Sequence, residues 1–418
     1  MLLQLAAALK IWSNPARSAD EMRALQSRQL RKLVARAYAT VPFYRKLFDD
    51  HGLVPADIRE IEDLEHLPLL SKQTIRDAAE QLISSRYKEG QLIRRRTGGS
   101  TGTPLSIYTS RRSAALDSAA KLRTYVRAGY KPHFKIAVAQ HAQPKGKMFH
   151  KLGIHREIGV PYNRPIEEQV RQIAELKTEV IDAQPNRIEL ISRYLLATST
   201  SLDRVKIVFT HSEKITDSQR NLVRRAFGLN LIDCYGCSES AAIAAECPAH
   251  EGYHINSDLV ILETVPIDDV HVDSSMKRIV VTNLNNFAMP LIRYEVGDLG
   301  ALSAKRCSCG NNFPLLAEIA GRTNDLVTLP SGEKVSGYAL ARAIEEHQEV
   351  LQYRAIQRRC GEFEISLILA DGAVAPEASL HKRLAADFPG VRVVFRYPDE
   401  IPLSPRGKLC RFESEYGA

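Results

Sequence analysis

The sequence predicts an α/β protein with two domains: a large multi-sheet N-terminal domain with helices packed on its sheets, and a small, mobile α+β domain at the C-terminus. Two observations carry this prediction. Strand-like runs alternate with helical patterns over roughly the first 300 residues, as in sheets layered with helices. After Gly321 the order of elements changes to that of a compact unit of about ninety residues. We therefore expect domains at 1–321 and 326–418, joined by a hinge at 322–325.

Helices in the first domain are predicted where apolar residues return every three or four positions. These segments are 22–40, 72–86, 112–128, 165–182 and 217–227. Short apolar runs between them predict strands at 135–139, 205–209, 229–232 and 278–282. In the second domain we expect a hairpin at 325–335, helices at 336–348 and 377–388, and strands at 350–358, 362–370 and 391–397.

Composition narrows the class of protein. The chain has 418 residues, of which 44% are hydrophobic and 25% charged, as is ordinary for a globular protein. A net charge of +8 suits an anionic partner, but the basic residues are scattered, and Arg94–Arg96 is their longest run. We therefore expect a nucleotide, coenzyme A or an acidic carrier protein as partner, and no nucleic acid.

The chain contains no apolar run near the roughly 18 residues of a membrane span, and no basic region precedes its apolar start. We expect a cytoplasmic protein that does not contact membranes, and a homodimer is compatible with the sequence. The seven cysteines are an odd number in a large chain. That number argues against a disulfide framework and for free thiols or a bound metal.

A loop rich in Gly, Ser and Thr lies between the short strand-like runs at 92–93 and 105–108. Glycines allow the close approach of a backbone to a ligand, and consecutive N–H groups and hydroxyls bind anions. The loop therefore suits a polyphosphate, although it lacks the lysine of a P-loop. A plain polar turn is the alternative. The candidate residues are Thr97, Gly98, Gly99, Ser100, Thr101, Gly102 and Thr103, followed by Pro104.

A second motif, Tyr235-Gly236-Cys237-Ser238-Glu239, follows the predicted strand at 229–232. The end of such a strand is where α/β sheets bind ligands. Tyr235 offers a ring for stacking, and Glu239 offers a carboxylate that would hold Mg²⁺ on the phosphates of ATP. A purely structural turn is the alternative.

Three further segments carry single charged residues. Asp298 follows a glycine turn and would bind the hydroxyls of a ribose, while Arg293 is either a ligand contact or a structural ion-pair partner. Arg322 lies in the predicted hinge and Lys408 in a polar tail. Taken singly, these two side chains are best explained as solvated charges.

Together and in this order, the five segments resemble the signature series of the adenylate-forming superfamily, which contains acyl-CoA synthetases, peptide-synthetase adenylation domains and firefly luciferase. The resemblance covers nearly the whole chain. The N-terminal segments 41–45 and 67–72, with 283–284 and 289–294, resemble the phenylacetate–CoA ligase branch and its relatives in capsule synthesis.

The resemblance implies a two-step reaction. ATP activates a carboxylic acid, here expected to be aromatic, to an acyl-adenylate, and coenzyme A then displaces AMP. Lys408 would contact the α-phosphate and the acid, Glu239 would hold Mg²⁺, and Arg322 would contact the ribose or a phosphate. Tyr235 would stack on adenine beside Gly236 and Ser238, and the glycine-rich loop would hold the leaving pyrophosphate.

Two departures from the family pattern stand out. Gly98-Gly99 replaces a pair that usually includes a serine, so one hydroxyl is lost from the loop. The family's pivot aspartate is replaced by Asn324, with Asp325 following. Asparagine still adopts unusual backbone angles, so we expect the hinge to move.

The cysteines and histidines suggest a metal. Cys247, His250, Cys307 and Cys309 form a set suited to structural Zn²⁺, with His254 as a spare, and unrelated thiols on two loops are the alternative. Relatives of this branch with similar sets favour zinc. Cys234 and Cys237 are interpreted as packing residues, because they lie within the second motif.

The pocket for the acid is the least defined part. Gln140 and His141, after the strand at 135–139, and Asp233 are weak candidates. Alternatives to coenzyme A as acceptor are a carrier-protein thiol or an amine. Two other classes of protein are alternatives: a zinc-stabilised nucleic-acid-binding protein and a pseudo-enzyme that senses nucleotide.

Overall fold

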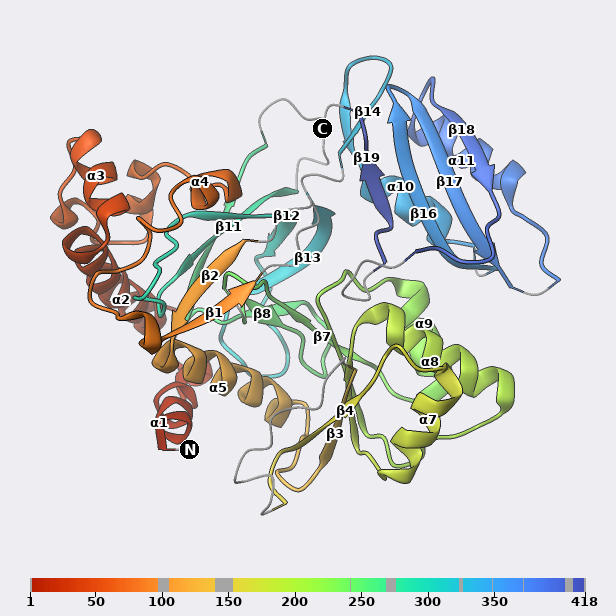
Figure 1. The fold of residues 1–418 in the computed structure, drawn as a ribbon, viewed down its shortest axis with the longest axis horizontal. Helices are drawn as coiled ribbons and strands as arrows, with labels where there is room; N and C mark the ends of the chain where they lie inside the picture. The colour runs from red at the N-terminus through yellow and green to blue at the C-terminus, as the bar shows by residue number, and fades with distance from the viewer. Residues whose placement is uncertain are drawn as a thin grey trace.

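The computed structural model describes residues 2–96, 105–139, 153–240, 242–267, 276–322, 326–347, 349–370, 372–402 and 409–416. Within these residues the main sheet has eleven strands in the order β10-β11-β12-β13-β9-β8-β7-β6-β5-β3-β4 (Figure 1). The strands are β3 (Lys135–Ala139), β4 (Arg156–Val160), β5 (Val180–Ala183), β6 (Ile207–His211), β7 (Ile232–Tyr235), β8 (Ala244–Ala245), β9 (Tyr253–Ile255), β10 (Val260–Val265), β11 (Lys277–Asn283), β12 (Tyr294–Ser303) and β13 (Leu315–Arg322).

The sheet has a parallel and an antiparallel half. Strands β3 to β7 pair in parallel, and β7 to β13 pair antiparallel through the short β8. A separate antiparallel hairpin consists of β1 (Leu92–Arg96) and β2 (Ser106–Ser110). Its last pair is Arg96 with Ser106, so the glycine-rich loop connects these two strands as predicted.

Helices cover both faces of the parallel half. On one face, α5 (Arg111–Arg127) packs Tyr125 against Phe209 and Ile136. On the other face, α7 (Ile166–Glu175), α8 (Pro185–Thr198) and α9 (Asp217–Phe227) pack against Ile181 and Val208. The alternate residues of each strand thus enter two different cores, as the two-residue period of a strand requires.

The antiparallel half packs against the N-terminal helices, which lie at the left of Figure 1. Leu30, Leu33 and Val34 from the long second helix are fully buried in this core. Ser18 caps that helix by accepting from the N–H of Glu21, whose carboxylate accepts from the N–H of Ser18 in return. These helices are α1 (Leu2–Ile11), α2 (Ala19–Thr40), α3 (Pro42–Asp50) and α4 (Lys72–Asp77).

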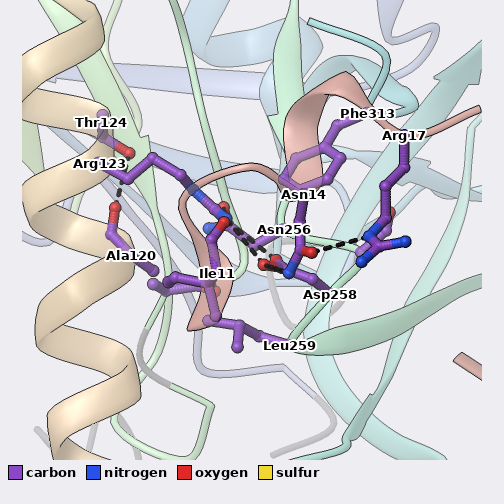
Figure 2. A network of polar contacts seen from close by, with 12 residues as sticks. Ile11, Asn14, Arg17, Ala120, Arg123, Thr124, Asn256, Asp258, Leu259 and Phe313 are labelled. Atoms are coloured by element: carbon purple, nitrogen blue, oxygen red, sulfur yellow. Dashed lines mark hydrogen bonds and ion pairs between the residues drawn. The ribbon is translucent and has the colours of Figure 1, made fainter. Parts of the chain in front are cut away.

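A buried polar network joins the N-terminal segment to the sheet (Figure 2). The Arg123 guanidinium on α5 donates to both carboxylate oxygens of Asp258, at 2.7 and 3.0 Å. It also donates to the carbonyl of Ile11 at 2.7 Å and to Oδ1 of Asn256 at 2.8 Å. Asn14 donates to Asp258 as well, at 2.8 Å. The network therefore fixes the end of α1 against α5 and the β9–β10 connection.

The C-terminal part has its own hydrophobic core, formed within residues 327–412. A four-stranded sheet in the order β18-β17-β16-β19 packs against two helices. Its elements are β14 (Leu326–Thr328), β15 (Lys334–Ser336), α10 (Gly337–Glu345), β16 (Val350–Arg359), β17 (Glu362–Leu369), α11 (Glu377–Asp387), β18 (Arg392–Arg396) and β19 (Phe412–Ser414). The predicted bounds, those of the hairpin included, lie within two residues of these, apart from the end of α10 at Glu345 in place of 348; β19 was not predicted.

Polar contacts connect the C-terminal part to the rest. Arg193 on α8 donates to the carbonyl of Leu351 at 3.3 Å, and Arg411 donates to the carbonyl of Lys214 at 3.3 Å. Arg411 also lies 4.0 Å from the Glu189 carboxylate. Figure 1 shows the C-terminal sheet beyond α8 and α9, consistent with these contacts.

Several predictions for the first domain were wrong in detail. The strand expected at 229–232 begins three residues later, as β7 at Ile232–Tyr235. The helix expected at 165–182 ends at Glu175, and its last residues form β5. The helix expected at 72–86 ends at Asp77, and α8 was not predicted at all. Within the part of the chain that the structure describes, no helix is long and apolar enough to cross a membrane.

Candidate active site

The second motif lies where β7 ends, at the carboxyl edge of the parallel strands. The Tyr235 hydroxyl donates to the Asp298 carboxylate at 2.7 Å, across the antiparallel half of the sheet. Asp298 lies on β12 opposite Arg322 of β13. Residues from the second and third motifs and the start of the predicted hinge therefore meet in one place, although 63 positions separate Tyr235 from Asp298.

Glu239 is held in a buried position four residues further on. Its side chain accepts a hydrogen bond from the Tyr294 hydroxyl at 2.6 Å. Burial and the Glu239 carboxylate raise the pKa of Tyr294 above its ordinary value, so the phenol keeps its proton and remains a donor. Sequence reasoning missed Tyr294, because a tyrosine within an apolar run gives no sign of its partner. This bond orients a carboxylate that is otherwise costly to bury.

The hairpin β1–β2 brings positive charge to the base of the glycine-rich loop. Arg94 donates to the Ser106 hydroxyl at 2.8 Å, and Arg95 pairs with Asp117 on α5 at 2.9 Å. The first contact joins the two strands of the hairpin, and the second holds the hairpin against α5. Gly236 and Ser238 follow Tyr235 in the turn after β7, and both residues are half-buried.

Several predicted site residues lie outside the described residues, and others are described only by their backbone. The first group is Thr97, Gly98, Gly99, Ser100, Thr101, Gly102, Thr103, Gln140, His141, Asn324, Asp325 and Lys408. For Arg322, the structure describes the backbone at the end of β13.

Arg293 has the structural role that was the alternative to ligand binding. Its guanidinium pairs with Glu263 at 3.0 Å and donates to the carbonyl of Leu67 at 2.6 Å. The residue is buried and has a left-handed φ of 53°. Because these partners enclose the guanidinium, Arg293 is removed from the set of cofactor-binding residues.

Asp233 is likewise enclosed rather than part of an open pocket. It accepts from the hydroxyls of Thr210 at 2.7 Å and Tyr253 at 2.9 Å, and its side chain is buried. Burial and the neighbouring Glu246 carboxylate raise the pKa of Asp233 to about 6. The assignment of Asp233 to the acid pocket is corrected to a buried structural carboxyl group.

The two cysteines of the second motif are packing residues, as predicted. Cys234 lies against the core under α5, and Cys237 against the core of the antiparallel half. Burial raises the pKa of both thiols well above the ordinary value, so neither is a thiolate.

Three of the other cysteines form a cluster with His254, in place of His250. The ligand atoms of Cys247, His254, Cys307 and Cys309 all lie within 4.8 Å of one another. The Cys247 and Cys307 sulfurs are 3.6 Å apart, and Cys309 Sγ lies 3.3 Å from His254 Nε2. His250 instead directs Nδ1 toward Glu246, at 3.8 Å. The spare histidine of the prediction therefore completes the set.

The geometry and charge of this cluster fit a tetrahedral zinc site. Zn–S bonds of about 2.3 Å place two ligand sulfurs about 3.8 Å apart, close to the observed separation. Burial lowers the pKa of His254, which favours the neutral imidazole that binds metals. Burial tends to raise the pKa of Cys309, but the N–H of Asn311 and the neighbouring thiols outweigh it, so this pKa is lowered.

Comparisons with known proteins agree with the arrangement of motifs. No family model matches the chain. The phenylacetate-coenzyme A ligase of Thermus thermophilus is 27% identical over 94% of this chain and 96% of its own length. That of Escherichia coli is 29% identical over 75% of this chain and 74% of its own length. Protein CapK of Staphylococcus aureus is 23% identical over 94% of this chain and 89% of its own.

The fold agrees as well. A 2-hydroxyisobutyryl-CoA ligase in its postadenylation state, bound to an acyl-adenylate, superposes with a TM-score of 0.79 at 18% identity, over 96% of this chain and 91% of that one. These similarities support the adenylate-forming superfamily. Within it, they support the phenylacetate–CoA ligase-like branch together with CapK.

The same fold recurs in a second structure of that ligase. The same 2-hydroxyisobutyryl-CoA ligase in its thioesterification state superposes with a TM-score of 0.65, against 0.79 for the postadenylation state.

Proposed function

We propose that this protein is an AMP-forming carboxylate–CoA ligase. The observation that carries the proposal is the pairing of Tyr235 with Asp298 beside the buried Glu239, in a chain of the adenylate-forming superfamily. These groups come from separate motifs and meet at the strand edge where α/β folds bind ligands. In the first step a carboxylate oxygen of the acid attacks the α-phosphorus of ATP, and pyrophosphate leaves.

Each motif has a proposed role in this step. Asp298 accepts from the ribose hydroxyls while Tyr235, whose hydroxyl it holds, presents its ring to the adenine. Glu239 holds Mg²⁺, and the metal, when bound, neutralises phosphate charge. Lys408 and Arg322 donate to the oxygens on which charge builds up, which is where fixed positive groups contribute most. The glycine-rich loop at 97–103 binds the pyrophosphate.

In the second step the thiol sulfur of coenzyme A attacks the acyl carbon, and AMP leaves. We propose that residues 326–418 turn about the hinge at 322–325 between the two steps, with Asn324 and Asp325 as its pivot. The separate core of the C-terminal part supports this division, because a unit with its own core moves as one body. Such closing motions are common in enzymes.

Pyrophosphate release from ATP with a panel of aryl and aliphatic acids tests the reaction. We expect acid-dependent release, and a thioester with coenzyme A as second product. Lys408→Ala should abolish pyrophosphate exchange while ATP still binds, and Lys382→Ala, an exposed lysine on α11, is the matched control. Unchanged exchange in Lys408→Ala contradicts the role of this lysine. A thioester or amide formed only with a carrier protein or an amine identifies a different acceptor.

We also propose that Cys247, His254, Cys307 and Cys309 hold a structural Zn²⁺. The ion would join β9 to the loop before β13, some distance along the chain from the reacting groups. Metal analysis of the purified protein should give one zinc per chain, and removal by a chelator should lower the melting temperature more than it lowers the rate of adenylation. A His254→Ala variant should lose zinc, whereas His250→Ala should keep it. A preparation without zinc contradicts the proposal.

The zinc-stabilised nucleic-acid-binding protein is not retained, because membership of the superfamily accounts for the motifs without it. Since ATP and coenzyme A are the proposed co-substrates, the cytoplasm is the compartment that we propose for the reaction.

A further inference from the structure

A second group of charged side chains lies at the same sheet edge, one strand away from Tyr235. β3, β5, β6 and β7 are parallel, so their carboxyl ends meet at this edge. Asp182 near the end of β5 lies beside Val138 of β3, and His211 at the end of β6 lies beside Cys234 of β7. Val138 and Cys234 both pack in the core under α5, so this set of residues lies on the face that α5 covers.

The Asp182 carboxylate is surrounded by three donors. Lys121 Nζ, from α5, donates to Oδ2 at 2.7 Å, and the Tyr125 hydroxyl donates to the same oxygen. His211 Nε2 lies 3.3 Å from Oδ1. Burial opposes ionisation of Asp182, but Lys121 and His211 outweigh it and hold its pKa below the usual range. Asp182 is therefore an anion that fixes the positions of two basic side chains.

The two basic side chains reach solvent, and the carboxylate does not. The side chain of Lys121 is 48% exposed and that of His211 is 35% exposed, against 2% for Asp182. The negative charge of Asp182 is thus buried between α5 and the sheet, and the two basic side chains lie between it and the solvent. A lysine ammonium has three N–H donors, and among the described residues Asp182 accepts from one of them. Donors remain for a ligand.

The charged residues of β4 do not occupy the remaining donors of Lys121. Glu157 on β4 lies near Lys121, but His155 lies 3.5 Å from its carboxylate and forms its ion pair. The group at the edge is therefore a cation held in place by Asp182 on a half-exposed side chain. Such a group binds an oxygen acceptor.

We propose that Lys121, positioned by Asp182, donates a hydrogen bond to an oxygen atom on the acyl part of the acid substrate. The enzyme would then prefer an acid that carries a hydroxyl, carbonyl or second carboxylate group over the matching hydrocarbon or unsubstituted aryl acid. The inference rests on the proposed function, which takes place at this edge of the sheet. Cys234, the residue before Tyr235 in β7, packs in the core under α5, the helix that carries Lys121. An acyl part that enters this side of the edge would extend toward Lys121.

The physical reason for the preference is the cost of desolvating a cation. An unsubstituted phenyl or alkyl group would remove water from the Lys121 ammonium without replacing its hydrogen bonds. Sites that bind a substrate oxygen reject analogues that lack it far more strongly than apolar pockets reject a methylene group. This revises the expectation of a plain aromatic acid.

Acid-dependent pyrophosphate release tests the inference on matched acids. The sets are benzoate with 4-hydroxybenzoate, phenylacetate with 4-hydroxyphenylacetate, and butanoate with 3-hydroxybutanoate, 3-oxobutanoate and butanedioate. We expect kcat/KM of the wild type to be at least about 10-fold higher for an oxygen-bearing acid than for its unsubstituted partner in one set or more. The three butanoate derivatives distinguish hydroxyl, carbonyl and carboxylate.

Lys121→Met should remove the preference. We expect kcat/KM for the preferred acid to fall by about 10- to 100-fold, and that for the unsubstituted partner to change by less than about threefold. Lys206→Met is the matched control. Lys206 directly precedes β6, at the end of that strand opposite His211, and its ammonium lies over the Phe134 ring. This variant should leave the preference intact. Lys121→Arg, which keeps a cation with N–H donors, should retain the order of preference even where Lys121→Met folds poorly.

Three outcomes overturn the inference. A wild type that uses the unsubstituted acid as well as its partner in every set has no such preference, although the proposed function then stands. A Lys121→Met variant whose kcat/KM falls by one common factor for all acids shows a general role for this lysine. A protein that binds ATP but activates no acid of any set contradicts the proposed function itself.

Discussion

Two basic side chains on α5, two positions apart, pair with aspartates in opposite ways. Arg123 is 5% exposed and directs its donors to Asp258, Asn256 and the carbonyl of Ile11, so that protein atoms enclose it (Figure 2). Lys121 is 48% exposed and donates to Asp182 from the open edge of the sheet. An enclosed pair joins parts of the fold, whereas a pair whose cation reaches solvent has donors left for a ligand.

The largest expected effect comes from breaking the enclosed pair. Arg123→Met leaves the Asp258 carboxylate buried without its cation, which should lower the free energy of unfolding by about 3 to 5 kcal/mol. Urea denaturation at pH 7 measures this. The double variant Arg123→Met/Asp258→Leu should regain part of the loss, because it buries no charge. A loss below about 1 kcal/mol in Arg123→Met would show that the pair is not closed in solution.

A third aspartate sharpens the comparison, because it has hydroxyl donors in place of a bonded cation. Burial and Glu246 raise the pKa of Asp233 to about 6, above an unfolded value near 4. Ionisation therefore costs folding energy, and the free energy of unfolding should fall as pH rises from about 4 to 6. Relative to Asp233→Asn, the wild type should lose about 2 to 3 kcal/mol over this range. Parallel pH profiles of the two proteins would contradict the raised pKa.

Breaking the open pair should cost less stability than breaking the enclosed one. Lys121→Met leaves Asp182 with Tyr125 and His211 as donors, and the half-exposed cation was partly solvated, so we expect a loss of about 1 to 2 kcal/mol. The pKa of Asp182 is lowered in the folded state. The contribution of the pair is therefore present above about pH 4 and is lost as pH falls below it. Urea denaturation at pH 7, 5 and 3.5 measures both, and a loss as large as that of Arg123→Met would remove the distinction.

The smallest effect is expected at a pair that is exposed on both sides. Lys46 and Asp50, one turn apart on α3, have side chains that are 72% and 52% exposed. Lys46→Met should change the free energy of unfolding by less than about 0.5 kcal/mol. This variant is the reference for Lys121→Met. A change above about 1 kcal/mol in Lys46→Met would mean that replacing any lysine alters the free energy of unfolding, whatever its partner.

Elements with clear end signals were predictable from the sequence. Helix α9 begins after Thr216, which caps it together with Gln219, and ends at Gly228 in the left-handed conformation, so its bounds at 217–227 are those predicted. Strand β3 at 135–139 was predicted as well, because its apolar run is short and isolated. Such signals are local, and a sequence displays them fully.

Elements buried on both faces were not predictable in the same way. Val180 and Ile181 continued the apolar pattern of α7, although Lys177, at a φ of 52°, turns the chain into β5. A short apolar run fits a buried strand and a buried helix equally well. Pro185 concealed α8, because a proline that looks like a break occupies the first turn of that helix.

Some residues of the candidate site were predictable from local sequence signals and others were not. Tyr235, Glu239 and Asp298 were found because each belongs to a motif that is continuous in sequence. Lys121 and Asp182 lie 61 positions apart and meet only through the packing of α5 on the sheet. No pattern along the chain connects them.

The proposed metal cluster contains the three predicted cysteines, and its histidine is His254 instead of His250. The spacing of Cys247 and His250 looked like a ligand pair, but His250 takes a left-handed φ of 53° and turns toward Glu246. Strand β9 instead carries His254 next to Leu315, which places its ring beside the thiols. The direction of a side chain depends on the strand register, which the sequence does not state.

Two of the contacts between the C-terminal part and the rest use main-chain carbonyl groups on the accepting side, those of Leu351 and Lys214. A carbonyl is the same whichever side chain the residue carries. Substitutions at positions 351 and 214 leave both acceptors in place, and the match between the domains depends on Arg193, Arg411 and the backbone path. These two contacts therefore tolerate a change of side chain at the accepting positions, provided that the two arginines are kept.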